Sequence, residues 1–347
     1  MRRVRSHRGA LIACGATLVP VAAVAHHSRA VFDTKQEVVI EGTVTKLDWR
    51  NPHIYFTVET KGTGGEPLLQ EIEATSVSEA NALGLAKEAV APGTRVVIRA
   101  NPNRQGAPAR ASGLSVKTLD GTVYPLNTDA KIAVAHTVTA QADSIAGRWA
   151  PTLDSFGAIL SSTRSWALTD AGRSAQAEVL KSLANASDVA ALGICEPIAP
   201  PILSIFPDMR SIEVGAATVV MRFEGAVGVR MERVVHLDQS AHPASVAPSV
   251  LGHSIGHWEG GTLVIDTVGF APYPLGLVMI PSSPAKHLVE RVTLANDRRH
   301  LQYAFTLEDP AYLAAPASYT ATWEYRPDLE PSGQPCDPET ARHPLTK

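Results

Sequence analysis

Histidines, carboxylates and one arginine with the capacity for proton transfer are spread along the second half of the chain. A histidine near a carboxylate can accept and return a proton, and an arginine can stabilise the anion that forms. Residues i and i+2 of a strand share a face. His236 and Asp238 are therefore predicted to point together, whereas His287 and Glu290 should point to opposite faces. The candidate catalytic residues, with His as base and Arg as anion stabiliser, are His236, Asp238, Asp266, His287, Glu290 and Arg291, near further imidazoles at His253 and His257.

In the interior of a barrel, such a set would suit elimination, isomerisation or hydration of a small molecule. The leading hypothesis is a periplasmic small-molecule-binding protein or a non-redox acid–base enzyme of lyase or isomerase type. The plainer alternative is that Asp266 caps a turn, that Glu290 and Arg291 are rim charges, and that the histidines are ordinary polar groups. No nucleophile elbow, phosphate-binding loop, dinucleotide fingerprint or Cys-x-x-Cys motif occurs in the sequence. Whether the protein is an enzyme, or an accessory or scaffold protein without a site, therefore stays open.

A second candidate site is a copper site near the start of the exported chain. If a signal is removed after Ala25, His26 becomes the N-terminal residue, and its amine and imidazole can chelate one metal ion. Nitrogen-rich tetragonal geometry suits Cu(II). His53 is the best further ligand because it lies on the Asn51-Pro52-His53 turn, and His27 is a less favourable one. Alternatively, the two N-terminal histidines belong to a frayed end and the turn joins two strands.

The first 25 residues have the pattern of a secretion signal. Four arginines precede the apolar stretch 9–25, which ends in Ala23-Val24-Ala25, the small-x-small pattern of a cleavage site. The stretch is shorter than the roughly 20 residues of a membrane span. We therefore expect a periplasmic protein without a span, cleaved after Ala25. Lipidation of Cys14, in Leu-Ile-Ala-Cys, is the minor alternative.

Without residues 1–25 the chain has 27 Lys and Arg against 34 Asp and Glu, a net charge of −7 with His neutral. Nucleic-acid binding needs clustered cations, so we expect a small-molecule ligand rather than a nucleic acid. The oligomeric state cannot be predicted. Cys195 and Cys336 remain after cleavage, and in an oxidising compartment two such thiols usually pair. Two separate buried thiols are the alternative.

Hydrophobic periodicity predicts a mainly β protein with two domains. In residues 30–128, period-2 patterns predict three strands, a helix over 76–88 and then two more strands, the order of an OB-like five-stranded barrel. Residues 129–144 form the expected linker. In residues 145–345, one helical segment at 168–192 precedes a Pro-rich stretch and eight short strands. This second part is predicted to be an antiparallel barrel or a strongly curved sheet, with a hairpin turn at Gly260-Gly261.

The sequence resembles a widespread bacterial family of exported proteins of unknown function. The resemblance rests on His26-His27-Ser28, on Asn51-Pro52-His53, and on four motifs of the second half: 147–149, 168–172, Cys195 and 258–267. It implies export and this architecture, but no chemistry. His257 stands where such proteins more often have Arg or Lys, and Gly261 where they usually have Asp.

Overall fold

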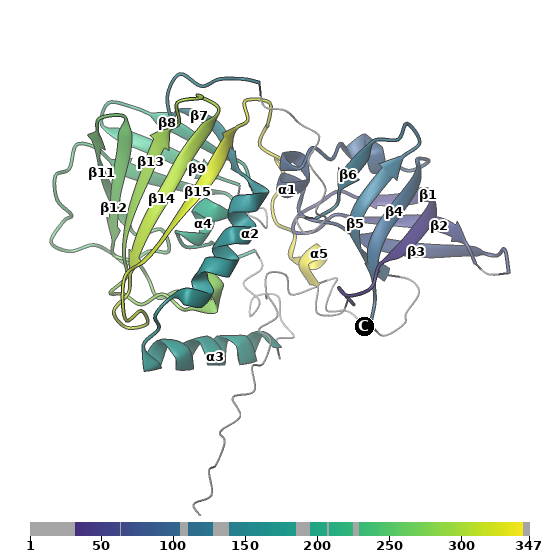
Figure 1. The fold of residues 1–347 in the computed structure, drawn as a ribbon, viewed down its shortest axis with the longest axis horizontal. Coiled ribbons are helices and arrows are strands. Elements are labelled where there is room, and N and C mark those ends of the chain that lie inside the picture. The colour runs from purple at the N-terminus through teal and green to yellow at the C-terminus, as the bar shows by residue number, and fades with distance from the viewer. Residues whose placement is uncertain are drawn as a thin grey trace, which may run out of the picture.

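The computed structural model describes residues 32–62, 64–104, 110–127, 139–184, 195–206, 208–224 and 229–342. Its strands form two β-barrels that lie side by side, with few helices (Figure 1). The mainly β fold class predicted from the sequence is confirmed. The predicted signal at residues 1–25 lies outside the described residues.

The N-terminal barrel contains the first six strands: β1 (Val38–Asp48), β2 (Tyr55–Lys61), β3 (Pro67–Glu73), β4 (Arg95–Pro102), β5 (Arg110–Thr118) and β6 (Val123–Pro125). They are arranged in the order β3-β2-β1-β4-β5-β6, and a parallel pairing of β3 with β5 closes the barrel. In β1, Ile40 and Val44 face the core while Glu41 and Thr45 are exposed. This is the OB-like barrel that the period-2 patterns predicted.

The predicted helix between the third and fourth strands is shorter than expected. Helix α1 (Val77–Ala82) begins at Ser76, whose hydroxyl accepts a hydrogen bond from the Glu79 N–H at 3.1 Å, as a capping residue does. Gly84, at φ +78°, ends the α-helical stretch, and a 3₁₀ turn, η2 (Lys87–Val90), follows.

The C-terminal barrel is closed by nine strands in the order β10-β11-β12-β13-β14-β15-β7-β8-β9. Eight of them correspond to predicted strands, and β7 contains the Gly147–Trp149 motif. Trp149 is fully buried and its indole N–H donates to the Ile145 carbonyl at 2.9 Å. The strands are β7 (Gly147–Pro151), β8 (Arg210–Val214), β9 (Thr218–Phe223), β10 (Met231–His236), β11 (His253–Glu259), β12 (Thr262–Val268), β13 (His287–Leu294), β14 (His300–Glu308) and β15 (Ala317–Tyr325).

One pair of neighbouring strands departs from the predicted antiparallel pattern. β10 and β11 are parallel, with Val235 opposite Ser254. Parallel neighbours need a long crossover connection rather than a tight turn, and the connection 237–252 supplies it. This crossover returns the chain to the end of the barrel at which β11 must begin.

Two longer helices accompany this barrel. The predicted helical segment appears as α3 (Asp170–Ala184), whose predicted continuation lies outside the described residues. Helix α2 (Leu153–Ser162), capped by Thr152, was not predicted from the sequence. α2 packs against β15, where the Tyr319 hydroxyl donates to the Ser155 carbonyl at 2.6 Å and the Thr322 N–H donates to the Ser155 hydroxyl at 2.8 Å.

The C-terminal tail returns to the N-terminal barrel. It carries α5 (Pro338–Arg342), beside that barrel in Figure 1. The predicted disulfide is confirmed: Cys336 pairs with Cys195, with Cα atoms 5.5 Å apart. Asn51 forms a β-bridge with Cys336, and its side-chain amide donates to the Gln334 carbonyl at 2.8 Å. The Asn-Pro-His turn thus anchors the tail.

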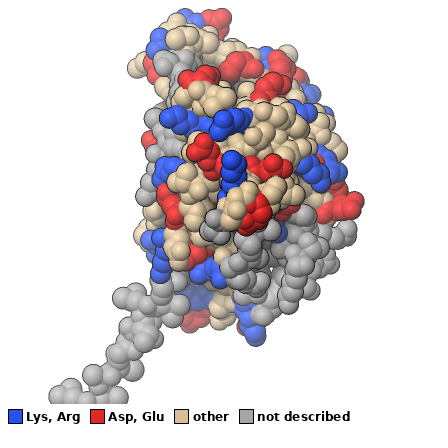
Figure 2. All heavy atoms as spheres, turned by 90° about the vertical axis from the view of Figure 1, so that its right-hand side faces the viewer, with Lys and Arg blue, Asp and Glu red and all other residues tan. Residues whose placement is uncertain are grey.

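The described surface has mixed charges, and the described helices are not of the membrane-spanning kind. On the face of the N-terminal barrel drawn in Figure 2, Lys and Arg side chains are mixed with Asp and Glu, and neither sign forms a broad patch over the described atoms. In the part of the chain that the structure describes, no helix has both the length and the apolar character needed to cross a membrane.

Candidate active site

Four of the six predicted catalytic residues meet at one rim of the C-terminal barrel, on its outer face. His236 lies at the end of β10, Asp266 near the end of β12 and His287 at the start of β13, while Asp238 follows β10. Their neighbours Val235, Thr267 and Leu288 are fully buried, so the alternation of each strand directs the candidates outward.

The crossover connection adds a histidine that was not among the predicted residues. His242 lies over the outer face, within hydrogen-bond distance of β11 and β12. The far end of the connection is fixed because the Ser249 N–H donates to the Gly269 carbonyl at 3.1 Å and the Ala271 N–H donates to the Ser249 carbonyl at 2.8 Å. Gly252 ends the connection at φ +70°, where a Cβ atom would lie 2.8 Å from Thr267 and the Val268 carbonyl. Only glycine fits there.

Hydrogen bonds and one ring stack join these side chains into one series. Asp266 Oδ1 lies 3.0 Å from Nε2 of His242 and 3.0 Å from Nε2 of His287. His242 Nδ1 lies 2.9 Å from His253 Nδ1. The His253 ring stacks on His236, with centroids 5.3 Å apart and planes 14° apart. At the other end, His287 Nδ1 lies 3.4 Å from Glu308.

These contacts determine the tautomers of two imidazoles in the state in which both rings are neutral. A carboxylate only accepts hydrogen bonds, so Nε2 of His242 carries the proton directed at Asp266. Neutral His242 then has a lone pair on Nδ1, and His253 must donate its Nδ1–H to it. Nε2 of His253 is therefore left with a lone pair that can accept a proton.

The electrostatics favour a neutral His253. Burial, together with the imidazoles of His242 and His236, lowers the pKa of His253 from its usual value of 6.5. The site is also open to small molecules, because the side chains of His236, His287 and Asp266 are 32%, 34% and 39% exposed. A half-buried neutral imidazole with a hydrogen-bonded partner behind it suits general-base chemistry.

The structure separates the other two candidates from this cluster. Arg291 points outward further along β13 and pairs with Glu259 at 2.6 Å. Glu290 points into the barrel and is fully buried. It accepts hydrogen bonds from both terminal nitrogens of Arg233, one of them at 3.0 Å, and from the Tyr303 hydroxyl at 2.8 Å. The interior thus holds a carboxylate and an arginine, but the predicted histidine lies outside.

A small cavity lies close to the start of β13. Lys286, just before β13, is buried beside a cavity of about 10 Å³, which is room for about one water molecule. Its ammonium donates to the Pro200 carbonyl and to the Ser282 hydroxyl, and lies 4.2 Å from the Phe270 ring centre. Burial lowers the pKa of Lys286 to about 7. Around Lys286, these contacts form a packed polar cluster.

The structure describes one of the three predicted copper ligands. His26 and His27 lie outside the described residues. His53 is largely buried, with Nδ1 3.3 Å from the Ala74 carbonyl and 4.0 Å from Glu73. Across the described residues, no three His, Cys, Asp or Glu side chains are arranged to hold a metal ion.

Comparison with known proteins gives one family match. Residues 14–114 match the model of a family of unknown function (DUF6152). The matched range includes the Asn51-Pro52-His53 turn and ends within β5. No curated protein and no solved structure matches the chain. The family match is consistent with the resemblance to an uncharacterised family and assigns no chemistry, so a functional proposal must rest on the geometry.

Proposed function

We propose that the protein is an exported, non-redox acid–base enzyme that acts on a small molecule at the outer rim of its C-terminal barrel. The observation that carries the proposal is the hydrogen-bonded series Asp266–His242–His253. His253 is the proposed general base, and its Nε2 accepts the proton from the substrate. The proposal keeps the reaction class expected from the sequence but moves it from the barrel interior to its outer face.

The proposed roles follow from the chemistry of the series. When Nε2 of His253 takes a proton, the ring becomes an imidazolium that still donates through Nδ1 to His242. His242 in turn donates its Nε2–H to Asp266. Asp266 stays an anion, stabilises the positive charge and holds His242 in the required tautomer, as an orienting carboxylate does in other histidine-based sites. The substrate's electron pair can then expel a leaving group or move to a neighbouring atom, which gives elimination or isomerisation.

Export is proposed on independent grounds. The signal pattern of residues 1–25 is followed by a chain whose two remaining cysteines lie within bonding geometry. Disulfides persist mainly in oxidising compartments such as the periplasm.

A base-sensitive elimination offers a test that needs no knowledge of the natural substrate. 5-Nitrobenzisoxazole opens when a base removes its C–H proton and the N–O bond breaks to give a phenolate, so its rate reports an accessible base. We expect the protein to accelerate this reaction, with the rate falling to background in His253→Ala and by roughly tenfold in His242→Ala. His257→Ala is the matched control, because this side chain lies on β11, is 63% exposed and bonds only to Glu259 among the described residues.

Modification by diethylpyrocarbonate, which acylates neutral imidazoles, locates the base directly. Peptide mass spectrometry should show His253 reacting at pH values where ordinary histidines are already protonated, because its pKa is lowered. If His253→Ala retains the elimination rate and His253 reacts no faster than His257, the general-base role is wrong. The cluster would then be a structural feature of an accessory protein.

A further inference from the structure

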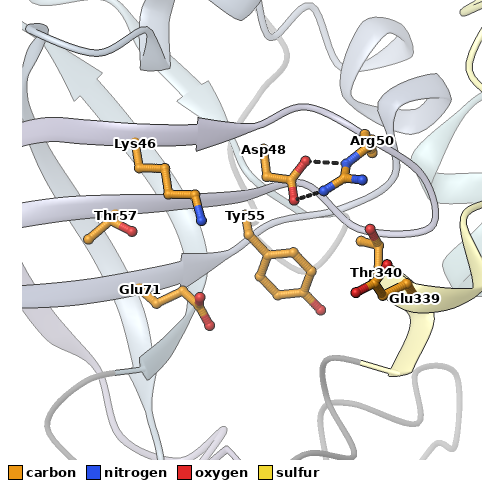
Figure 3. A pocket seen from close by; sticks show the side chains of 8 residues that line it. All are labelled: Lys46, Asp48, Arg50, Tyr55, Thr57, Glu71, Glu339 and Thr340. Carbon is orange, nitrogen blue, oxygen red and sulfur yellow. Dashed lines mark hydrogen bonds and ion pairs between the residues drawn. The ribbon is translucent and has the colours of Figure 1, made fainter.

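A second pocket lies at the N-terminal barrel, far along the chain from the histidine cluster. It is bounded by β1, β2 and β3 on one side and by α5 of the C-terminal tail on the other (Figure 3). Its volume is about 170 Å³. This is smaller than the pockets that hold drug-sized ligands, so the space suits a small metabolite. The lining residues are Lys46, Asp48, Arg50, Tyr55, Thr57, Glu71, Glu339 and Thr340.

One cation of the pocket is already neutralised. Arg50 bonds both carboxylate oxygens of Asp48, at 2.5 and 2.6 Å, and reaches Asp337 at 2.8 Å. Such two-pronged contacts hold a guanidinium in a fixed position. Arg50 therefore forms part of the wall and has little charge to offer a ligand.

Lys46 is the cation left for a ligand. Its ammonium forms no ion pair and no hydrogen bond with any described residue, and it points into the space between Thr57, Tyr55 and Glu71 in Figure 3. An ammonium with three free donors is a suitable partner for a carboxylate or another small anion.

The opposite end of the pocket is acidic. Glu339 is exposed and lies at the start of α5, where its backbone N–H donates to Asp337 at 2.9 Å. Glu71 lies instead at the Lys46 end, because Thr57 pairs with Lys46 on one side and with Glu71 on the other, and its carboxylate is 3.6 Å from Arg110. Figure 3 shows the Tyr55 ring between the Lys46 end and the Glu339 end. The pocket thus presents a cation and an anion on either side of an aromatic wall.

We propose that this pocket binds a small zwitterion of the free amino-acid class. The ligand carboxylate lies on Lys46, and its ammonium lies on Glu339, past the Tyr55 ring. Opposite charges at the two ends fit both groups of a zwitterion in one orientation, whereas a simple anion or a simple cation leaves one end of the pocket unmatched. This site is independent of the proposed acid–base function.

The position of the tail makes half of this site depend on the disulfide. Glu339 and Thr340 follow Cys336 by three and four residues, and Cys336 is bonded to Cys195. The Asp337 N–H donates to the Asn51 carbonyl at 3.1 Å, which docks the same segment on the barrel. Reduction frees the tail from Cys195, so we expect zwitterion binding to weaken in the reduced protein.

Isothermal titration calorimetry on the full mature chain with its disulfide intact tests the proposal. The probes are L-alanine, L-glutamate and L-lysine, with propionate and ethylamine as analogues that each lack one charge of alanine. We expect at least one amino acid to bind and both analogues to bind at least tenfold more weakly. Removing a charge-assisted hydrogen bond at either end of the ligand corresponds to roughly a ten- to hundredfold change in Kd. Lys46→Met and Glu339→Gln should each weaken binding by that factor.

Lys117→Met is the matched control, because Lys117 is exposed on β5 of the same barrel and does not line the pocket. Circular dichroism of each variant confirms that the fold is kept. The proposal is overturned if propionate binds as tightly as the amino acids, since that result indicates a plain anion site. It is also overturned if Lys46→Met binds like wild type, or if none of the three amino acids binds at about 10 mM.

Discussion

Replacing Glu290 by glutamine should destabilise the C-terminal barrel strongly. Glu290 is fully buried, and the Arg233 side chain that it pairs with is 2% exposed. An amide in place of the carboxylate leaves the Arg233 guanidinium without a counter-charge in the core. It also places the amide N–H groups of the new glutamine against the N–H groups of Arg233. Removing one partner of a buried pair costs about 3–5 kcal/mol. We therefore expect Glu290→Gln to lower the free energy of unfolding by that amount.

Glu259→Gln is a closely matched comparison. It breaks the Glu259–Arg291 pair, which is also a Glu–Arg contact on this barrel, but both side chains are nearly half exposed, at 49% and 46%. Exposed pairs contribute about 0.2–1 kcal/mol. Guanidinium-induced unfolding followed by circular dichroism gives the stability loss of both variants under identical conditions. The slope m of the free energy of unfolding against denaturant concentration should stay unchanged.

The double variant Arg233→Met/Glu290→Leu separates charge from packing. It removes both charges while filling similar volume, so its free energy of unfolding should recover much of the way toward wild type. The reasoning is refuted if Glu290→Gln costs no more than Glu259→Gln. If Glu290→Gln folds with wild-type stability but loses the elimination activity, Glu290 belongs to the catalytic machinery after all.

Three further predictions concern Lys286, the disulfide and Asn51. The pKa of Lys286 is lowered to about 7 in the folded chain, so between pH 7 and pH 10 the unfolded chain carries a proton that the folded chain lacks. The free energy of unfolding should therefore rise by roughly 2–3 kcal/mol from pH 7 to 9 relative to that of Lys286→Met. Chemical denaturation of both proteins at each pH measures this difference. An equal dependence of the free energy of unfolding on pH in the two proteins would contradict the prediction. The Cys195→Ser/Cys336→Ser variant should be less stable by about 4–5 kcal/mol, because the bond closes a loop of sequence separation 141. An unfolding midpoint equal to that of the wild type under oxidising conditions would contradict this. Asn51→Ala should lower the free energy of unfolding by about 2–4 kcal/mol, since the buried Asn51 amide bonds both the Val77 N–H, at 2.9 Å, and the Gln334 carbonyl. Asn296→Ala, at an exposed asparagine, is the control. If Asn51→Ala costs no more than this control, the Asn-Pro-His turn does not anchor the tail.

The fold was predictable where local patterns determine it. Ile40 and Val44 alternate with polar residues along β1, and Ser76 before α1 marks a capped start, so the order of strands and helix in the N-terminal barrel followed from periodicity. Helix α2 was not predicted because its ten residues carry no strong pattern, and its place depends on tertiary contacts of Ser155 with β15.

The site was predictable only in part because it depends on how distant segments meet. Alternation indicated correctly that His287 and Glu290 face opposite sides. It did not show that the face with the histidines is the outer one, since either face of a barrel strand can be apolar when a loop covers the outside. His242 was not predicted because it lies in an irregular segment without period, and only the parallel pairing of β10 and β11 brings that crossover over Asp266.

The most direct test of the proposed general base is the protonation state of His253 in solution. Long-range ¹H–¹⁵N correlation spectra of selectively ¹⁵N-histidine-labelled protein, assigned with His253→Ala, give the tautomer and the titration midpoint of each imidazole. We expect His253 at neutral pH to carry its proton on Nδ1 and to titrate below 6.5. A proton on Nε2 of His253, or a midpoint at or above 6.5, would contradict the general-base assignment.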